Sequence, residues 1–228
     1  MTIFVKTHPM EKDQLAELAS QLSHPSGEKG NEIAQMMNET NIGMTKNAIL
    51  NLDLSSNDSV LELGHGNAGH VEFLFAQCEN IRYTGLEIST LMNREAQLLN
   101  ESFVTSEKAS FTLYDGEKIP FKDNEFNKLL TVNTLYFWKN PMELLTELSR
   151  VLKPQALFSL TFAHRSFMET LPFTPFGFTL YNPDEVLELV NQSAFSLHKE
   201  DAQTEVVLTK TGESVARQFS TLVLKNHK

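Results

Sequence analysis

One stretch of the chain, Ser59–His70, constrains the possible folds more than any other. It is an apolar segment that predicts a buried strand, followed directly by three glycines. Gly64, Gly66 and Gly69 permit a tight turn that lets the backbone approach a ligand, and a following helix directs its N–H groups into the same place. Because Gly-x-Gly-x-x-Gly also arises by chance, the surrounding residues decide whether this is a ligand site.

A helix and a second strand follow the glycines. Apolar residues on one helical face predict the helix over 69–77, and Ile81–Ile88 reads as a strand. Glu87 stands near the end of that strand, about 20 residues beyond the glycines, where a carboxylate accepts hydrogen bonds from two ribose hydroxyls. This β-α-β start predicts a nucleoside ligand beside Glu87 and Ile88.

Two classes of cofactor are common on such a start: the nicotinamide or flavin dinucleotides, and S-adenosylmethionine. Glu62 lies inside the first strand, where a negative charge suits a sulfonium and an ammonium group but does nothing for a pyrophosphate. A third strand over Ala109–Tyr114 ends at Asp115, which places a carboxylate where an adenine amino group can donate a hydrogen bond. Both features favour S-adenosylmethionine.

The next predicted elements make the pattern specific enough to compare with a known family. A fourth strand, Lys128–Val132, runs into a polar and aromatic segment, and then come a helix over 142–153 and a fifth strand over 156–162. From about Asn41 to Phe162 the chain resembles the class I S-adenosylmethionine-dependent methyltransferases, in particular their small-molecule branch. Ala68 departs from the pattern, because many relatives carry a third glycine there. The resemblance implies cofactor contacts from Glu62, Gly64, Gly66, Gly69, Glu87, Ile88, Asp115, Gly116, Glu117, Asn133 and Thr134.

The resemblance also implies an α/β fold: a Rossmann-like, doubly wound sheet of seven strands with a C-terminal antiparallel hairpin and an N-terminal helical cap. The hairpin is expected from long strands at 195–209 and 216–224, joined through Thr211–Glu213. A length of 228 residues, 41% hydrophobic content and the lack of a Pro/Gly/Ser linker predict one domain. Its parts are a cap over 1–50, a cofactor-binding core over 51–163, a lid over 164–181, and a C-terminal helix and hairpin over 182–228.

The cap and the lid are the parts expected to bind substrate. Helices are predicted in the cap over 11–22, 30–38 and 45–51, either closing over the ligands or only covering the sheet. The lid is rich in Phe and Pro, which favours an apolar or aromatic acceptor pocket unless its phenylalanines only anchor the loop. The residues predicted to line the pocket are Thr45, Trp138, Phe173 and Phe176.

The expected chemistry is direct in-line displacement, in which a substrate O, N, S or C atom attacks the sulfonium methyl. Alignment of the reactants supplies on the order of 7–11 kcal/mol in favourable cases, and a base is needed only if the acceptor loses a proton. His164, directly after the fifth strand, is a stronger candidate for base or substrate contact than His65 in the glycine turn. Tyr136, after the fourth strand, is the second predicted catalytic residue. No metal is predicted, because the histidines lack ligand spacing.

Charge and cysteine content bear on partners and location. A formal net charge of −10 without any run of Lys or Arg argues against nucleic acid, whose binding requires cations that neutralise phosphates. The single cysteine, Cys78, suits a reducing cytoplasm, and neither a signal-peptide core nor a membrane-length apolar run is expected. We predict a cytoplasmic monomer or homodimer that acts on a small molecule, with no nucleic-acid or membrane partner.

Two other functions remain open. An NAD(P)-dependent oxidoreductase uses a similar sheet; Glu62, Asp115 and the antiparallel finish disfavour it, whereas tight NADH or NADPH binding would support it. A catalytically inactive cofactor-binding interaction protein would bind S-adenosylmethionine without methyl transfer to any acceptor.

Overall fold

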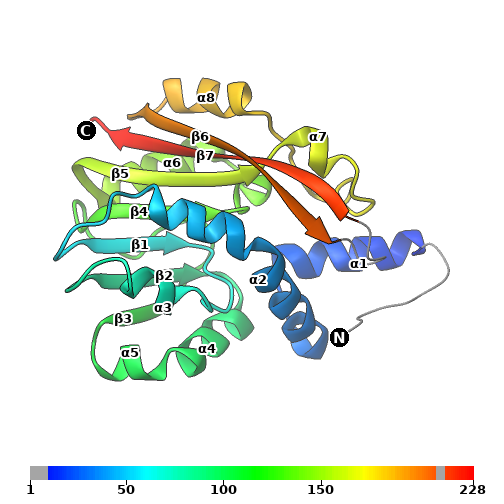
Figure 1. Cartoon of the computed structure of the whole chain (residues 1–228), viewed down its shortest axis with the longest axis horizontal. Coiled ribbons are helices and arrows are strands. Elements are labelled where there is room, and N and C mark those ends of the chain that lie inside the picture. The colour runs from blue at the N-terminus through cyan, green and yellow to red at the C-terminus, as the bar shows by residue number, and fades with distance from the viewer. Residues whose placement is uncertain (1–9, 209–213) are drawn as a thin grey trace.

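A seven-stranded mixed sheet in the order β3-β2-β1-β4-β5-β7-β6 forms the centre of the molecule (Figure 1). The computed structural model describes residues 10–208 and 214–228. The N-terminal residues 1–9 and the predicted hairpin turn Thr211–Glu213 lie outside these ranges. The strands are β1 Ser59–Leu63, β2 Arg82–Glu87, β3 Ala109–Leu113, β4 Phe126–Val132, β5 Leu152–Ala163, β6 Phe195–Leu208 and β7 Ser214–Asn226.

Strand direction confirms the predicted doubly wound fold. β1 pairs in parallel with β2 on one side and with β4 on the other, so the strand order reverses between β1 and β4. β6 and β7 pair antiparallel and form the predicted C-terminal hairpin. β7 also pairs antiparallel with β5, which joins the hairpin to the rest of the sheet. Doubly wound sheets bind ligands outside the carboxyl ends of the strands at such a reversal.

Helices cover both faces of the sheet. The elements are α1 Lys12–Ser23, α2 Gly27–Leu50, α3 Val71–Phe75, α4 Thr90–Leu99, α5 Glu101–Thr105, the 3-10 helix η1 Leu135–Phe137, α6 Pro141–Val151, α7 Arg165–Met168 and α8 Pro183–Asn191. Among these described helices none is long and apolar enough to cross a membrane. α1 and the N-terminal half of α2 stand at the end to which the parallel strands point, over the strand reversal (Figure 1).

Alternate residues of the parallel strands enter two separate cores. In β4, Leu129 packs into a cluster with α6 and α8, whereas Leu130 packs into a cluster with α2, α3 and α4. β1 behaves in the same way, with Leu61 in the first cluster and Val60 in the second. Because successive side chains point to opposite faces, a strand buried on both sides is largely apolar along its length. This requirement explains the continuous apolar runs in the sequence.

The cap differs from its prediction. The sequence predicts separate helices over 30–38 and 45–51, but α2 is one continuous helix of 24 residues. No proline interrupts 39–44, and the one glycine there, Gly43, costs a helix only about 1 kcal/mol. A Cβ at Gly43 would also meet the carboxylate of Glu205 on β6, so a side chain there would require Glu205 to shift. Met44 is fully buried in the core beneath α2.

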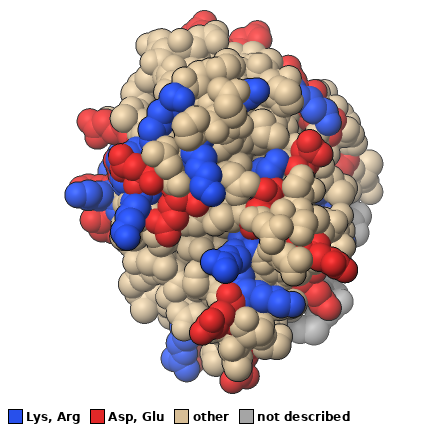
Figure 2. All heavy atoms as spheres, turned by 90° about the vertical axis from the view of Figure 1, so that its left-hand side faces the viewer, with Lys and Arg blue, Asp and Glu red and all other residues tan. Residues whose placement is uncertain are grey.

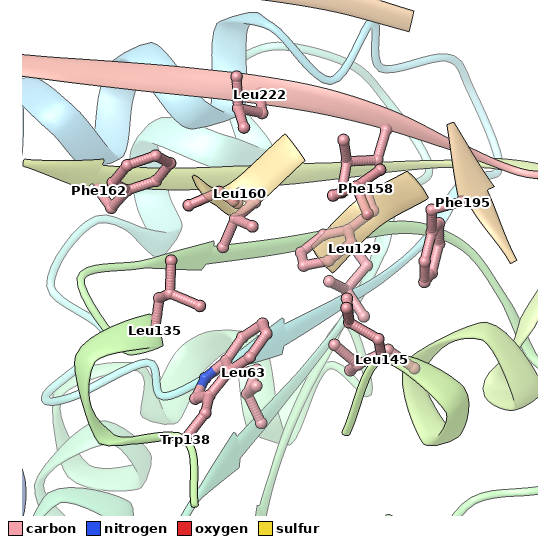
Figure 3. Packing of buried hydrophobic residues seen from close by; sticks show 14 of the residues in the cluster. Leu63, Leu129, Leu135, Trp138, Leu145, Phe158, Leu160, Phe162, Phe195 and Leu222 are labelled. Atoms are coloured by element: carbon pink, nitrogen blue, oxygen red, sulfur yellow. The ribbon is translucent and has the colours of Figure 1, made fainter. Parts of the chain in front are cut away.

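We expect Phe158→Ala on β5 to lower the free energy of unfolding by about 3–5 kcal/mol, because it leaves a cavity in a close-packed core. Phe158 is fully buried and its ring centroid lies 5.5 Å from that of Phe195 (Figure 3). Urea denaturation measures the loss. Val206→Ala on β6 is the control, because Val206 is 70% exposed. A Phe158 variant as stable as this control would contradict the packing described here.

Candidate active site

A cavity of about 490 Å³ opens at the carboxyl ends of the parallel strands, where their order reverses. Its walls come from the glycine turn after β1, the end of β2, the segments after β3 and β4, and the cap helices α1 and α2. The elements that the sequence analysis singled out separately therefore meet at one site.

The glycine turn contains two left-handed glycines with different surroundings. Gly64 has φ +73°, and a Cβ there would lie 2.5 Å from Thr134 Cγ2, so the turn packs directly on the segment after β4. Gly66 has φ +56°, and a Cβ there would meet nothing within 4 Å. Gly64 is thus needed for packing, whereas Gly66 borders open space in the cavity.

The departure at Ala68 and the position of Gly69 have structural explanations. Ala68 itself takes the left-handed conformation, with φ +53°, which glycine adopts more readily than alanine. Gly69 does not line the cavity. A Cβ on Gly69 would lie 2.9 Å from Nδ2 of Asn38, so this glycine makes room for α2 instead of contacting a ligand.

Glu62 lies at the cavity wall in a buried hydrogen-bond network. Its Oε2 accepts from Tyr83 Oη at 2.5 Å and from His70 Nε2 at 2.7 Å, and Glu62 is 2% exposed. Burial acts to raise the pKa of Glu62, but the interaction with His70 and the hydrogen bonds from His70 and Tyr83 together hold it below its usual value. The site therefore has an anionic group on β1, and no described residue donates to its other oxygen, Oε1.

Glu87 ties the turn after β1 to the turn after β2. Its Oε2 accepts from Gly66 N at 3.0 Å, and its Oε1 accepts from Ile88 N at 2.8 Å and Ser89 N at 3.0 Å. Burial raises the pKa of Glu87, against the opposing effect of these three backbone donors. Since a carboxylate has about four acceptor positions, one remains rather than the two that the ribose prediction requires.

Asp115 holds its loop with one oxygen only. Oδ1 accepts from the backbone N–H groups of Glu117 at 2.9 Å and Lys118 at 3.0 Å, and these bonds lower the pKa of Asp115. The side chain is exposed, so Oδ2 is available to a ligand donor. Gly116, with φ +84°, brings the loop to Ile88, whose Cγ2 lies 3.4 Å from the position of an added Cβ. Asp115, Gly116, Glu117 and Ile88 all line the cavity.

The segment after β4 contributes the polar side chains of Asn133 and Thr134. Asn133 has φ +58°, and its Oδ1 accepts from Tyr136 Oη at 3.1 Å and Ala163 N at 3.3 Å. Thr134 Oγ1 accepts from Trp138 Nε1 at 3.1 Å, which fixes the indole ring at the wall. Asn133, Thr134 and Trp138 line the cavity, and so does Thr45 of α2, which was predicted for the pocket together with Trp138.

The two residues predicted to be catalytic do not line the cavity. The Tyr136 hydroxyl accepts from Ala163 N at 2.7 Å, and its single proton is shared between Ala163 O at 3.0 Å and Asn133 Oδ1 at 3.1 Å. His164 Nε2 lies 2.9 Å from Ser220 Oγ on β7. His164 directly follows β5, which is one strand farther than β4 from the strand reversal. Both side chains bond to partners within the fold, and neither lies at the cavity wall, where His164 was expected as a base or substrate contact and Tyr136 as a catalytic residue.

Phe173 and Phe176 also lie off the cavity wall. The lid is packed on its own aromatic residues: Phe173 stacks near Phe178 with centroids 5.7 Å apart, and Phe178 packs on Phe137 at 4.6 Å. The alternative that the phenylalanines anchor the loop describes this arrangement better than an acceptor pocket.

The polar face of α2 was not predicted from the sequence. Asn38 and Asn41 line the cavity together with Thr45, and their spacing of three and four residues puts all three on one helical face. Predicting a break between two helices hid this periodicity. No cluster of three His, Cys, Asp or Glu residues suited to a metal ion occurs within 10–208 and 214–228.

His65 is the titratable group of the turn with the least polar environment. Its Nδ1 lies 2.8 Å from the carbonyl oxygen of Gly66 and therefore carries the donated proton, while the buried Nε2 has no partner among the described residues. The ring packs edge-on against Phe111 with centroids 5.0 Å apart. Burial lowers the pKa of His65 from 6.5 to about 4, despite the opposing attraction of Glu62.

We expect His65 to lower the free energy of unfolding as the pH falls. The unfolded chain binds a proton near pH 6.5 and the folded chain only near pH 4, so its stabilising effect is present above this window and is lost as pH falls through it. Between pH 7 and pH 5 the loss is about 2 kcal/mol. Urea denaturation of His65→Gln should show a smaller loss than the native protein, while the exposed His198→Gln keeps the full loss. An unchanged loss in His65→Gln would refute this assignment.

Comparison with known proteins agrees with the site. A family described as "Methyltransferase domain" matches residues 61–160. The biotin biosynthesis bifunctional protein BioHC of Teredinibacter turnerae is 30% identical over 112 residues, which are 47% of this chain and 20% of that protein. A tRNA U34 carboxymethyltransferase of Nautilia profundicola is 31% identical over 98 residues, 43% of this chain and 32% of that protein. The chain thus spans a fifth to a third of the length of these two relatives.

A solved structure extends the likeness over the whole fold. The putative methyltransferase in a complex with the Trm112 methyltransferase activator of Haloferax volcanii superposes with a TM-score of 0.71, covering 96% of this chain and 99% of that one. Its 16% identity shows a shared fold and nothing finer. Residues 61–160 therefore match a methyltransferase domain, and the chain as a whole has the fold of the class I S-adenosylmethionine-dependent methyltransferases.

Proposed function

We propose that this protein transfers the methyl group of S-adenosylmethionine to a small-molecule acceptor by direct in-line displacement. The observation that carries the proposal is the convergence on one cavity of three carboxylates, Glu62, Glu87 and Asp115, from the ends of β1, β2 and β3. Each carboxylate has a different environment, and each suits a different part of the cofactor.

The residues fit the cofactor in chemical type. Asp115 offers an available oxygen to the adenine amino group, and Glu87 offers one remaining acceptor position to a ribose hydroxyl. Glu62, anionic and with an unbonded oxygen, suits the positive charge of the methionine end. Gly66 leaves open space where a side chain would obstruct a ligand. We therefore propose these four residues as cofactor contacts.

When bound, the cofactor supplies an activated methyl group, so the chain's residues have to position the reactants. We propose that Asn133, Thr134 and Trp138 line the reacting end, with the indole fixed by its bond to Thr134. The cap helix α2 covers the same end through Thr45 and limits the entry of water. Alignment of this kind is worth on the order of 7–11 kcal/mol in favourable cases. No step is assigned to Tyr136 or His164.

The charge of the cavity wall favours a small acceptor over a nucleic acid. The wall includes five carboxylate residues, Glu62, Glu87, Asp115, Glu117 and Glu143, against a single Lys or Arg, Lys139. Phosphates bind through Lys and Arg, so this wall repels a polyanion. On the opposite end of the molecule Lys and Arg are interspersed with Asp and Glu and form no continuous basic surface (Figure 2). A small uncharged or cationic acceptor fits this electrostatic environment.

Isothermal titration with S-adenosylmethionine, S-adenosylhomocysteine and NADH tests the proposal first. Micromolar binding of the first two alone, followed by transfer of labelled methyl to a member of a small-metabolite panel, is the expected result. Binding of NADH alone would replace the proposal with an oxidoreductase. Binding without transfer to any metabolite or to bulk tRNA would indicate an inactive interaction protein, and transfer to tRNA alone would refute the small-molecule acceptor.

Asp115→Asn should reverse the preference for the base of the cofactor. Asparagine keeps the oxygen that accepts from Glu117 and Lys118 but replaces the available oxygen with a donor. We expect S-adenosylhomocysteine to bind about tenfold more weakly, and S-inosylhomocysteine, which has a carbonyl in place of the adenine amino group, to bind more tightly. Titration with both ligands measures the reversal. Equal weakening for both would show that Asp115 only shapes its loop.

Gly66→Ala should remove cofactor binding while the protein still folds. The added Cβ meets no protein atom within 4 Å but fills space at the proposed site. Gly27→Ala is a matched control, because Gly27 has φ +62°, also has nothing within 4 Å of an added Cβ, and does not line the cavity. Both variants should lose about 1–2 kcal/mol of stability to backbone strain. Equal affinity for S-adenosylhomocysteine in the two variants would count against the proposed site.

A further inference from the structure

A buried guanidinium on β7 ties the C-terminal hairpin to the cap helix. Arg217, 6% exposed, donates to Glu205 Oε1 on β6 through Nε at 3.0 Å and Nη2 at 2.7 Å. Nη2 also donates to the carbonyl oxygen of Thr40 at 2.6 Å, and Nη1 donates to Asn41 Oδ1 at 2.9 Å. Gly43 permits this contact by leaving space for the Glu205 carboxylate. The hairpin therefore fixes the part of α2 that faces the cavity.

The bond to Asn41 settles which way its amide points. A guanidinium only donates hydrogen bonds, so the amide oxygen has to face Arg217 and the NH₂ group is directed away from it. Asn41 lines the cavity, and no described residue accepts a hydrogen bond from its Nδ2. The cavity wall thus contains a donor whose orientation is imposed by a residue outside the cavity.

Asn41 belongs to the β4 side of the cavity. It precedes Met44 and Thr45 by about one helical turn, and Met44 Sδ lies 3.5 Å from Asn133 Nδ2 at the end of β4. Asp115 follows β3, which is separated from β4 by β2 and β1 in the sheet. The donor therefore lies on the side opposite the adenine contact that we propose.

We infer that Asn41 Nδ2 binds an uncharged carbonyl oxygen of the acceptor, and that Arg217 is a positioning residue that orients this amide. The inference rests on the proposed function and deepens it. An oxygen acceptor follows from the fixed donor, and the lack of charge follows from the acidic wall, where Glu143 and Glu62 disfavour a carboxylate. Apolar wall residues, among them Met37, Phe137 and Leu144, suit a hydrocarbon body.

Asn41→Asp tests this inference by exchanging the donor for an acceptor of the same shape. The substitution is compatible with folding, because Arg217 then pairs with a carboxylate. Methyl pentyl ketone, hexylamine and hexanoate are the probes, and saturation-transfer NMR of the full chain with S-adenosylhomocysteine measures their binding. We expect the native protein to prefer the ketone, and Asn41→Asp to bind the ketone about tenfold more weakly while binding hexylamine more tightly.

Three control variants test whether Arg217 orients the Asn41 amide. They separate this role from a general effect on the structure and from the effect of an added negative charge. Asn38→Asp adds the same charge one turn earlier on the cavity face of α2, without a bond to Arg217, and should leave the ketone preferred. Arg217→Lys keeps a cationic donor and should retain the preference, whereas Arg217→Gln, which also offers an acceptor, should reduce it. Affinity for S-adenosylhomocysteine should be the same in all variants.

The results distinguish the two levels of inference. If the native protein fails to bind S-adenosylhomocysteine, the proposed function fails and this inference fails with it. If S-adenosylhomocysteine binds, three results would each overturn the role of Asn41 alone: an unchanged preference in Asn41→Asp, the same reversal in Asn38→Asp, or no binding of the ketone to the native protein. Tighter binding of hexanoate than of the ketone would overturn the uncharged acceptor.

Discussion

A carboxylate buried at the end of a strand has to be hydrogen-bonded, and the site of this protein depends on that requirement. Glu87 accepts from three backbone N–H groups and thereby joins the glycine turn to the end of β2. Glu62 accepts from Tyr83 and His70 and joins β1 to β2 and to the residue before α3. These hydrogen bonds set the shape of the glycine turn. In this shape the turn leaves open space beside Gly66.

The second constraint acts from the opposite side of the cavity. α2 covers the strand reversal, and the C-terminal hairpin holds it through polar contacts: Asp201 accepts from Asn47 and Asn51, and Arg217 bonds to Thr40 and Asn41. The hairpin therefore does more than complete the sheet, because it determines which polar groups α2 presents to a ligand. The side of the cavity that we propose for the acceptor is therefore shaped by residues far away in the chain.

The positions of Tyr136 and His164 bear on mechanism. Their polar atoms bond to Ala163 and Ser220, and neither side chain lines the cavity. A methyl donor is activated before it binds, so a site of this kind relies on alignment and exclusion of water more than on proton transfer. The acidic wall, the fixed indole of Trp138 and the oriented amide of Asn41 are the features that would select an acceptor.

The sequence by itself determined the sheet and the cofactor end of the site, because strand periodicity, glycine spacing and strand-end carboxylates are local patterns. Glu62, Glu87 and Asp115 could be singled out in this way, and the doubly wound sheet of seven strands followed from the family resemblance. Only the tertiary structure decided which residues line the side of the cavity that we propose for the acceptor. The continuity of α2, the burial of Tyr136 and the pairing of Arg217 with Asn41 depend on contacts between segments as many as 176 residues apart. Local periodicity carries no information about such contacts, since they form only when the hairpin packs on the cap.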